Sequence, residues 1–321
     1  MTLLHTALGI TDFKSNPFLS NLVPAAAASY AVQAAFGVPS ILRHTELLYD
    51  FSGGISFYCT LAASLVLPVL RARPASSNND NAPSLSTGEW NWRQLVMTGA
   101  TFLYAARLST YLFIRVLKKG SDSRWDSTKQ KPLRAAVLWL LQGLWVVLCC
   151  MPTIAVDSVP AAAFKALPGG GRTVSATDVL GLSLFVFGLA VEITADYQKS
   201  AWYDQKSLKL HDEQFITRGL WARSRYPNYF GDITLWTGMA TTAAGLLVRE
   251  PVQAALGWNG GVTGLAKAIL LPALAPAFVS WALTRVSGVP LSEKKYDRLY
   301  RDNKEYQKWR NNTPLLVPKL F

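Results

Sequence analysis

Charged side chains are scarce in this sequence, and the common nucleotide-binding motifs are missing from it. Only 16% of its 321 residues are Asp, Glu, Lys or Arg, whereas 50% are hydrophobic. Neither GxGxxG nor GxxxxGK[ST] occurs, so if a nucleotide binds, we expect it to bind without a Rossmann domain or a P-loop. Low charge combined with high hydrophobicity is typical of membrane proteins.

Histidine and cysteine are also rare, with three of each. The histidines are far apart and show no metal-binding spacing such as HExxH, which predicts that the protein has no metal centre. Cys59, Cys149 and Cys150 fall in apolar stretches, and the adjacent pair suits neither a zinc site nor an ordinary disulfide. We interpret the three cysteines as small packing residues.

Long apolar stretches make up much of the chain. A helix needs roughly 20 apolar residues to cross a bilayer, and windows of about that length recur seven times. The predicted fold is therefore all-α: a polytopic membrane protein with seven transmembrane helices in one bundle. The sequence has no internal repeat and no boundary that would separate a soluble domain, so residues 1–321 are predicted to form one membrane domain. The windows are 20–40, 51–70, 95–117, 135–156, 177–195, 231–248 and 262–285.

The first of these windows is expected to stay in the mature protein. The N-terminal segment has no basic region before its first apolar run, which argues against a cleaved signal peptide.

The net charge of +12 is distributed unevenly. The loops after the first, third, fifth and seventh windows hold 21 Lys and Arg residues, and the other loops and the N-terminal segment hold seven. Because basic loops stay in the cytosol, the C-terminus is predicted to be cytosolic and the N-terminus to be outside or in a lumen. The charge therefore indicates a membrane topology and anionic membrane lipids rather than a nucleic-acid partner.

The window 95–117 carries a polar stripe. At about 100° per residue, Tyr104, Arg107, Tyr111 and Arg115 fall within roughly 60° of one another on a helix. Arg115 is close enough to the predicted cytosolic end to snorkel. Arg107 would lie roughly 15 Å inside the span, where an unpaired guanidinium is costly, so it needs an anion or a wet cavity.

A second polar constellation leaves the fifth window in "VEITADYQKSAWYDQK". Glu192, Asp196 and Lys199 are spaced four and three residues apart and share one helical face. Asp196 and Lys199 could neutralise each other as a local ion pair. Glu192 lies deeper in the apolar segment and is harder to explain in that way.

A third constellation is the stretch "WARSRYPNYFGD" before the sixth window. Its proline and glycine break regular structure around Asn228, so backbone groups and the Asn228 amide can face a polar cavity. Arg223 and Arg225 suit either lipid phosphates or a phosphorylated adenine nucleotide. Asp232, just inside the window, needs a polar partner too. The basic, tyrosine-rich tail that ends the chain is predicted to be a solvated helix.

In combination, these segments resemble the steroid 5α-reductase family in its broad sense of membrane NADPH-dependent enone reductases. The resemblance rests on "RLSTYLFIR", "ADYQK", "RGLWARSRYPNYFGD" and the tyrosine-rich tail, in that order, over residues 95–321. Sterol reductases and isoprenylcysteine carboxyl methyltransferases share the PNYFG-type segment. The "ADYQK" segment and the arginine of "RLSTYL" favour the reductase branch.

The resemblance implies a bundle that holds NADPH in a cytosol-facing polar cavity. Tyr104 matches the tyrosine that polarises the substrate carbonyl, and the acid that accompanies it is expected near the second window, at Glu46 or Asp50. The matching cofactor positions are Arg107, Arg124, Glu192, Asp196, Arg218, Asn228, Asp232, Arg285 and Tyr296. The constellations described above add Arg115, Lys199, Arg223 and Arg225 to the candidate cofactor residues.

Two positions depart from the family's pattern. Tyr226 stands where many relatives carry histidine, which puts a cofactor role for this position in doubt. Asp232 replaces the usual glutamate, which keeps the charge but shortens the reach of the side chain.

The resulting hypothesis is an NADPH-dependent reductase. It would reduce a C=C bond conjugated to a carbonyl in a lipophilic substrate such as a steroid or terpenoid. We expect a monomer in the endoplasmic reticulum membrane. One alternative is an S-adenosylmethionine-dependent methyltransferase acting on a lipid or prenylated substrate, and another is a non-enzymatic lipid-binding membrane protein.

Overall fold

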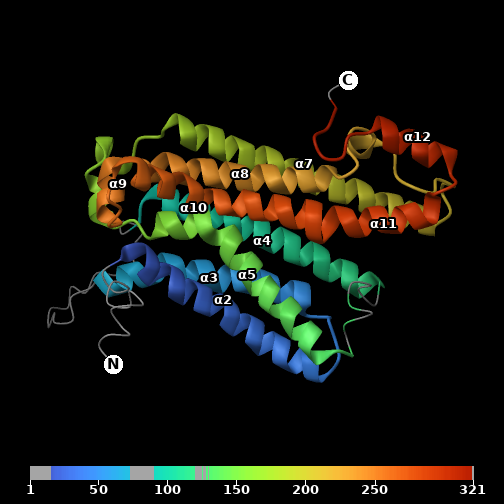
Figure 1. Ribbon diagram of the computed structural model, residues 1–321, viewed down its shortest axis with the longest axis horizontal. Coiled ribbons are helices and arrows are strands. Elements are labelled where there is room, and N and C mark those ends of the chain that lie inside the picture. Colours follow the sequence, from blue (N-terminus) through green and yellow to red (C-terminus); the bar gives the residue numbers. More distant parts are fainter. Residues whose placement is uncertain (1–15, 73–89, 120–124, 126–127, 129, 320–321) are drawn as a thin grey trace. The chain divides into compact units, whose positions relative to one another are not determined.

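The structure is a computed structural model, and it describes residues 16–72, 90–119, 125, 128 and 130–319. Throughout these residues the regular structure is helical, with no strand (Figure 1). Each of the seven apolar windows coincides with a long helix, and the all-α prediction is confirmed for the described residues.

Five segments are long and apolar enough to cross a membrane, which indicates an integral membrane protein. The third and sixth windows form the helices α4 (Trp92–Lys119) and α8 (Pro227–Leu247), which are not among the five. The arginines of α4 and the threonines and glycines of α8 lower the hydropathy of these helices, so seven crossings remain a prediction. The five segments are Pro17–Leu42, Tyr49–Arg71, Pro132–Asp157, Pro168–Ser207 and Gly261–Tyr300.

Contacts within the chain define two compact units, each of which is described by itself. Unit 1 runs to Ser175 and includes residues 243–274. Unit 2 comprises residues 176–242 and 275–321. The helices α8 and α10 (Gly261–Trp281) contribute to both units.

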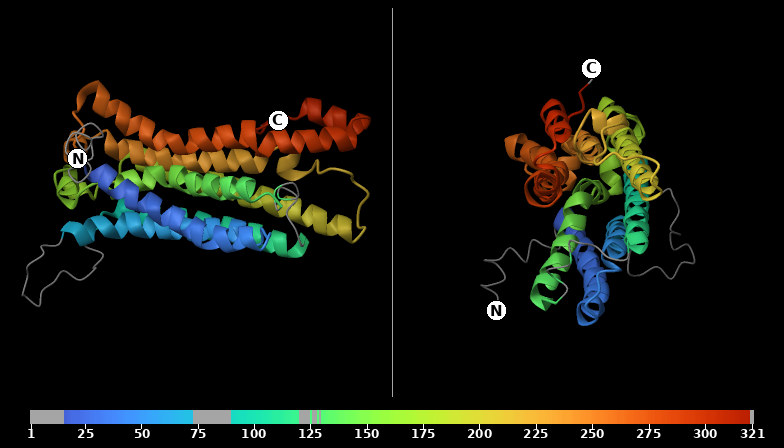
Figure 2. Two further views of the ribbon diagram at one scale, coloured as in Figure 1. Left: turned by 60° about the horizontal axis from the view of Figure 1, so that its bottom comes forward. Right: turned by 90° about the vertical axis from the view of Figure 1, so that its right-hand side faces the viewer.

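Unit 1 is built around α3 (Tyr49–Ala72), which contacts α2 (Pro17–Leu42), α4 and α5 (Pro132–Asp157) (Figures 1 and 2). Small residues let these backbones approach closely. A Cβ on Gly143 of α5 would lie 2.8 Å from the ring of Tyr30 on α2. Such contacts are the usual basis of helix packing in membranes. The short elements of the unit are α6 (Ala161–Lys165), η2 (Pro168–Gly171) and α9 (Glu250–Ala255).

Short polar side chains bond across the helices inside unit 1. The Asn21 amide donates to the Ser64 carbonyl at 3.1 Å and to the Ser158 hydroxyl at 3.2 Å. The Ser64 hydroxyl donates to Asp157 Oδ2 at 2.9 Å. Interhelical bonds of this kind hold helices together in an apolar environment.

The three cysteines are free thiols, with Cys149 and Cys150 buried and Cys59 half-buried. This agrees with their interpretation as packing residues.

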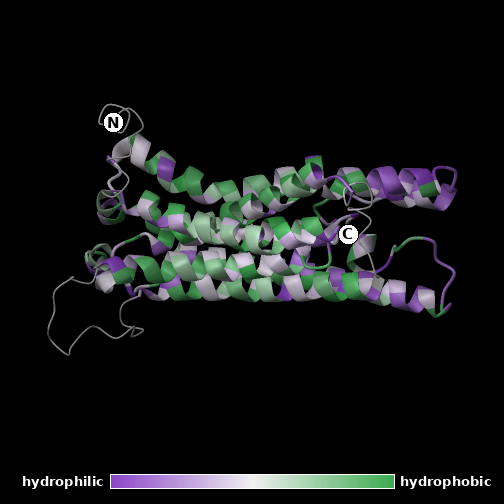
Figure 3. Ribbon diagram, turned by 90° about the horizontal axis from the view of Figure 1, so that it is seen from below, coloured by the Kyte–Doolittle hydropathy of each residue, from purple (hydrophilic) through white to green (hydrophobic). Residues whose placement is uncertain are grey.

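Unit 2 contains α7 (Ala176–Ser207), η3 (Gly219–Ala222), the first part of α8, and the chain from residue 275 onward. There the chain forms the π-helical turn η4 (Ala282–Val286), α11 (Gly288–Tyr300) and α12 (Lys304–Asn312). Hydrophilic residues gather in the region where Figure 1 places α11 and α12 (Figure 3).

Candidate functional site

Glycines bring the backbones of α7 and α8 into direct contact. A Cβ on Gly188 would lie 2.5 Å from the carbonyl oxygen of Gly231, and one on Gly231 would lie 2.6 Å from that of Gly188. Gly181 and Gly238 repeat the contact seven residues away on each helix. No larger residue fits at these positions, because an added Cβ would meet backbone atoms. We call these four residues the glycine seam.

The seam sets the register between the two helices and thereby gathers acidic side chains. Glu192 follows Gly188 by one turn, and Asp232 follows Gly231 directly. The Asn228 amide donates to Asp196 Oδ1 at 3.4 Å. The structure therefore brings together the polar residues that the sequence places in two separate segments. Glu192, Asp196 and Asp232 are 4%, 6% and 8% exposed.

The side chains of this acidic cluster offer mainly hydrogen-bond acceptors. Ionised carboxylates can only accept hydrogen bonds. The side-chain oxygen of Asn228 is buried and has no hydrogen-bond partner in the part of the chain that the structure describes. A buried acceptor without a donor is costly, so the Asn228 oxygen is poised for a donor from a ligand. Hydroxyl and amide N–H groups are suitable donors.

Trp221 anchors the loop that leads into α8. Its indole N–H donates to the carbonyl of Ala195 on α7 at 3.0 Å, and the side chain is buried. Gly219 has a φ of 62°, and the following amide of Leu220 donates to Gln198 at 2.9 Å. The ammonium of Lys199 lies 4.7 Å from the centre of the Trp221 ring, a cation–π distance. The loop is thus fixed to the cytosol-directed end predicted for α7.

Residues 314–319 form a C-terminal strap that holds the next part of the loop. The amides of Arg225 and Tyr226 donate to the carbonyls of Pro314 and Leu315 at 2.9 and 3.1 Å. The Ser224 hydroxyl donates to the carbonyl of Leu316 at 2.7 Å, and the amide of Lys319 donates to that of Arg223 at 3.0 Å. The backbone before Asn228 is therefore held by α7 through Trp221 and Leu220 and by the C-terminal strap through residues 223–226.

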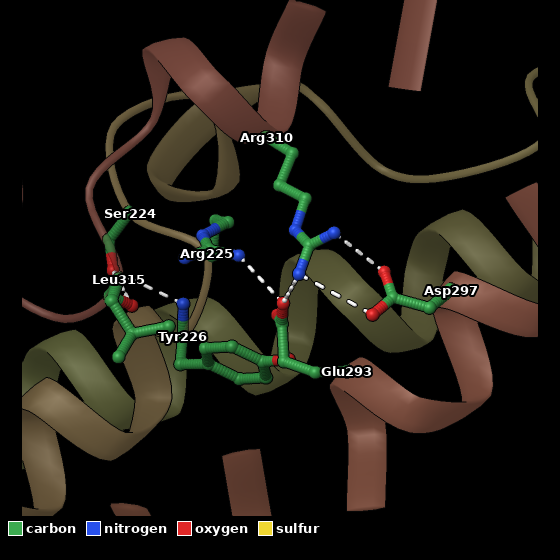
Figure 4. A network of polar contacts seen from close by, with 7 residues as sticks. All are labelled: Ser224, Arg225, Tyr226, Glu293, Asp297, Arg310 and Leu315. Atoms are coloured by element: carbon green, nitrogen blue, oxygen red, sulfur yellow. Dashed lines mark hydrogen bonds and ion pairs between the residues drawn. The ribbon is translucent and has the colours of Figure 1, made fainter. Parts of the chain in front are cut away.

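A charged network centred on Glu293 of α11 completes this support (Figure 4). Glu293 Oε2 pairs with Arg225 at 2.8 Å and with Arg310 at 3.0 Å. The Tyr226 hydroxyl donates to Glu293 Oε1 at 2.7 Å. Arg310 also pairs with Asp297 at 2.7 Å. The two arginines and the two acids balance in charge, and Arg225 already has a partner within the protein.

Tyr226 contributes its hydroxyl to this network as a hydrogen-bond donor. Burial raises the pKa of its phenol, and the hydrogen bond to Glu293 raises it further. The hydroxyl therefore stays protonated and serves as a donor within the network.

The remaining predicted residues of unit 2 make other contacts. Arg218 donates to Gln205 at 2.8 Å and lies 3.7 Å from Glu213, in the loop between α7 and η3. Arg285 is exposed on η4. Tyr296 is half-buried on α11, and its ring stacks on Tyr300. Arg223 has an exposed side chain.

The predicted stripe is present on α4 of unit 1. The guanidinium groups of Arg107 and Arg115 lie 5.4 and 6.0 Å from the centre of the Tyr111 ring. Tyr104 is completely buried, and its ring packs edge-on against Phe57 of α3 at 6.0 Å. A buried phenol beside a line of cations can polarise a carbonyl oxygen.

The contacts between α3 and α4 show where Glu46 and Asp50, the two candidates for the acid that accompanies Tyr104, lie relative to α3. The helices are antiparallel, since Phe57 faces Tyr104 and Phe51 packs on Phe113. Asp50 lies seven residues before Phe57, which is about 10 Å along α3. Glu46 is buried and precedes α3. The assignment of Glu46 or Asp50 as the second acid stays a prediction. Arg124 lies outside the described residues.

The network residues Glu293, Asp297 and Arg310 are absent from the predictions made from the sequence. Glu293 and Asp297 are spaced four residues apart, which places both on one face of α11. That spacing was a usable signal, but the tail also reads as a solvated helix. In the structure Tyr306 of α12 is buried and packs against Phe215, so the tail is part of the core of unit 2.

The profile of a family described as a protein of unknown function, DUF1295, matches residues 80–313. No curated protein and no solved structure matches the chain.

Proposed function

Since the chain belongs to the DUF1295 family, whose description names no activity, we propose a function from the residues themselves. We propose that the protein is an NADPH-dependent reductase of a C=C bond conjugated to a carbonyl in a lipophilic substrate. The resemblance to the steroid 5α-reductase family supports this proposal over residues 95–321, which overlap most of the family match. The observation that carries it is the cluster of acids and Asn228 at the glycine seam.

The residues of the seam fit the polar parts of a dinucleotide. The ribose hydroxyls and the nicotinamide amide are donors, and the buried Asn228 oxygen lacks a donor among the described residues. The carboxylates of Glu192, Asp196 and Asp232 offer further acceptors. Phosphates need cations, and the exposed Arg223 of unit 2 is a candidate for that role.

When bound, NADPH supplies the hydride that reduces the double bond. Tyr104 would donate a hydrogen bond or proton to the carbonyl oxygen as negative charge develops there. Its complete burial excludes water, and a hydrogen bond in such a site stabilises charge more than it does in water. Asn228 would orient the cofactor and take no part in proton transfer.

We further infer that the protein acts as a monomer in the endoplasmic reticulum membrane with its C-terminus in the cytosol. The excess of Lys and Arg in alternate loops supports this orientation.

Calorimetric titration of the detergent-solubilised protein tests the proposal. We expect NADPH to bind and NADH to bind at least about tenfold more weakly, because arginines favour the 2′-phosphate. Equal affinities would remove the argument from the phosphate. Binding of S-adenosylmethionine alone would place the protein among the methyltransferases, and binding of none of the three would favour a lipid-binding role.

A further inference from the structure

A basic groove lies on unit 2, between α11 and α12. Its volume is about 880 Å³. Four of its lining residues are cations and only one is an acid, so its net charge is +3. The lining residues are Lys294, Asp297, Arg298, Arg301, Gln307 and Arg310.

The charges of this groove are only partly neutralised within the protein. Arg310 is held by Glu293 and Asp297. Lys294, Arg298 and Arg301 are exposed and have no carboxylate at ion-pair distance among the described residues. They are spaced four and three residues apart, so they share one face of α11 and its end. Three cations on one face form a site for an anion with more than one charge.

The position of the groove along α11 relates it to the membrane. The seventh apolar window ends at residue 285, and α11 continues the chain from there. Two exposed leucines of α11, Leu291 and Leu299, lie on either side of Lys294 and Arg298. A helix that carries exposed leucines beside lysines and arginines suits the interface of an anionic membrane, where phosphorylated headgroups project.

We propose that the groove between α11 and α12 binds the phosphate monoesters of a membrane lipid headgroup, as in a phosphorylated phosphatidylinositol. Lys294, Arg298 and Arg301 bind the phosphates. Gln307 and Asp297 face hydroxyl groups of the sugar ring, for which an amide and a carboxylate are suitable partners. Arg310 remains paired and fixes the shape of the wall. This proposal does not depend on the reductase activity.

Native mass spectrometry of the full-length protein in detergent tests this site. The probe is dioctanoyl phosphatidylinositol 4,5-bisphosphate, compared with dioctanoyl phosphatidylinositol, which has no monoester, and with soluble inositol 1,4,5-trisphosphate. We expect the bisphosphate lipid to bind at least about tenfold more tightly than either. The triple variant Lys294→Ala, Arg298→Ala, Arg301→Ala should lose affinity on the order of 100-fold, since each surface cation contributes about fivefold.

A matched control removes three exposed cations that do not line the groove. The variant Lys295→Ala, Lys304→Ala, Lys308→Ala has the same net charge and should keep its affinity within about threefold. The single change Arg298→Glu provides a second test if the triple variant does not fold. The proposal is overturned if the control loses as much affinity as the groove variant, or if the soluble trisphosphate binds as tightly as the lipid. Displacement of the lipid by NADPH would also overturn it, because the groove would then belong to a nucleotide site.

Discussion

The α4 stripe of unit 1 and the glycine seam of unit 2 offer opposite chemistries by different means. The stripe carries phenols and guanidinium groups on a single helix, and helical periodicity alone places them on one face. The seam carries carboxylates and an amide on two helices, and they meet only because glycines let the backbones touch. The comparison separates a donor-rich surface suited to a carbonyl or phosphate from an acceptor-rich one suited to hydroxyls and amides. Changes in the stripe should therefore affect turnover, and changes in the seam should affect cofactor binding.

The largest expected effect is that of removing the Tyr104 hydroxyl. Tyr104→Phe keeps the ring packed on Phe57 but loses the donor, so turnover should fall roughly 10²–10⁴-fold, the usual contribution of one positioned acid. The affinity for NADPH should barely change. Single-turnover oxidation of NADPH with an enone substrate measures the effect.

Tyr58→Phe is a matched control on the neighbouring helix. The Tyr58 hydroxyl donates to the carbonyl of Phe102 at 3.2 Å, and its loss should leave turnover near the wild-type rate. A Tyr104→Phe variant that is as active as wild type would show that the stripe supplies no proton donor.

The second effect concerns binding at the seam. Asn228→Ala should weaken NADPH binding at least about tenfold, because it removes an amide that the ligand would use. In a thermal-shift assay in detergent, NADPH should stabilise the wild type and not the variant. Asn303→Ala removes the N-cap of α12 and should lower the melting temperature but keep the NADPH-induced shift. Equal NADPH-induced shifts in the wild type and Asn228→Ala would contradict a role for the seam in binding.

The third effect concerns stability, and it compares a glycine of the seam on α8 with a glycine on α4. Gly231→Ala places a Cβ 2.6 Å from the Gly188 carbonyl oxygen, so we expect a loss of about 1–3 kcal/mol in the free energy of unfolding and weaker cofactor binding. Gly99→Ala on α4 meets no atom within 4 Å and should be neutral or stabilising by up to about 1 kcal/mol. Denaturant titration followed by tryptophan fluorescence compares the two variants. A harmless Gly231→Ala would mean that the seam does not set the register.

The smallest expected effect is on the pH dependence of stability, and it comes from Tyr306 in the tail of unit 2. Burial, and then the charge of Glu293, raise the pKa of Tyr306 to about 12. A phenol in the unfolded chain loses its proton near pH 10, so between about pH 10 and 12 the folded state holds more protons and stability falls as the pH rises. Tyr306→Phe removes this contribution, and its melting temperature should fall less than that of the wild type over this range. Parallel curves for the two proteins would contradict the shifted pKa.

The sequence predicted some of these features because they depend on local periodicity. The seven apolar windows became long helices, and the stripe on α4 follows from spacings of three and four residues within one helix. The union of Glu192 and Asp196 with Asn228 and Asp232 was expected only through resemblance to a family, because it depends on the contact between α7 and α8. The glycines that make this contact were visible in the sequence, but their partners were not.

The network around Glu293 was missed for a related reason. Its members come from the loop before α8, from α11 and from α12, and their charges are ordinary in a basic tail. A solvated helix and a helix that packs on a loop have similar charge patterns. Only the tertiary contacts of Tyr306 and Arg310 distinguish the two.

The C-terminal strap also sets an order of events during biosynthesis. Residues 314–319 follow every helix that the structure describes, so the ribosome makes them after α7 and α8 are complete. Until they leave the exit tunnel, the amides of Arg225 and Tyr226 lack the carbonyls that hold them in the structure. The loop before Asn228 therefore reaches its final conformation only after α12 has been made, and a nascent chain in which α7 and α8 are already inserted still has an unfinished site.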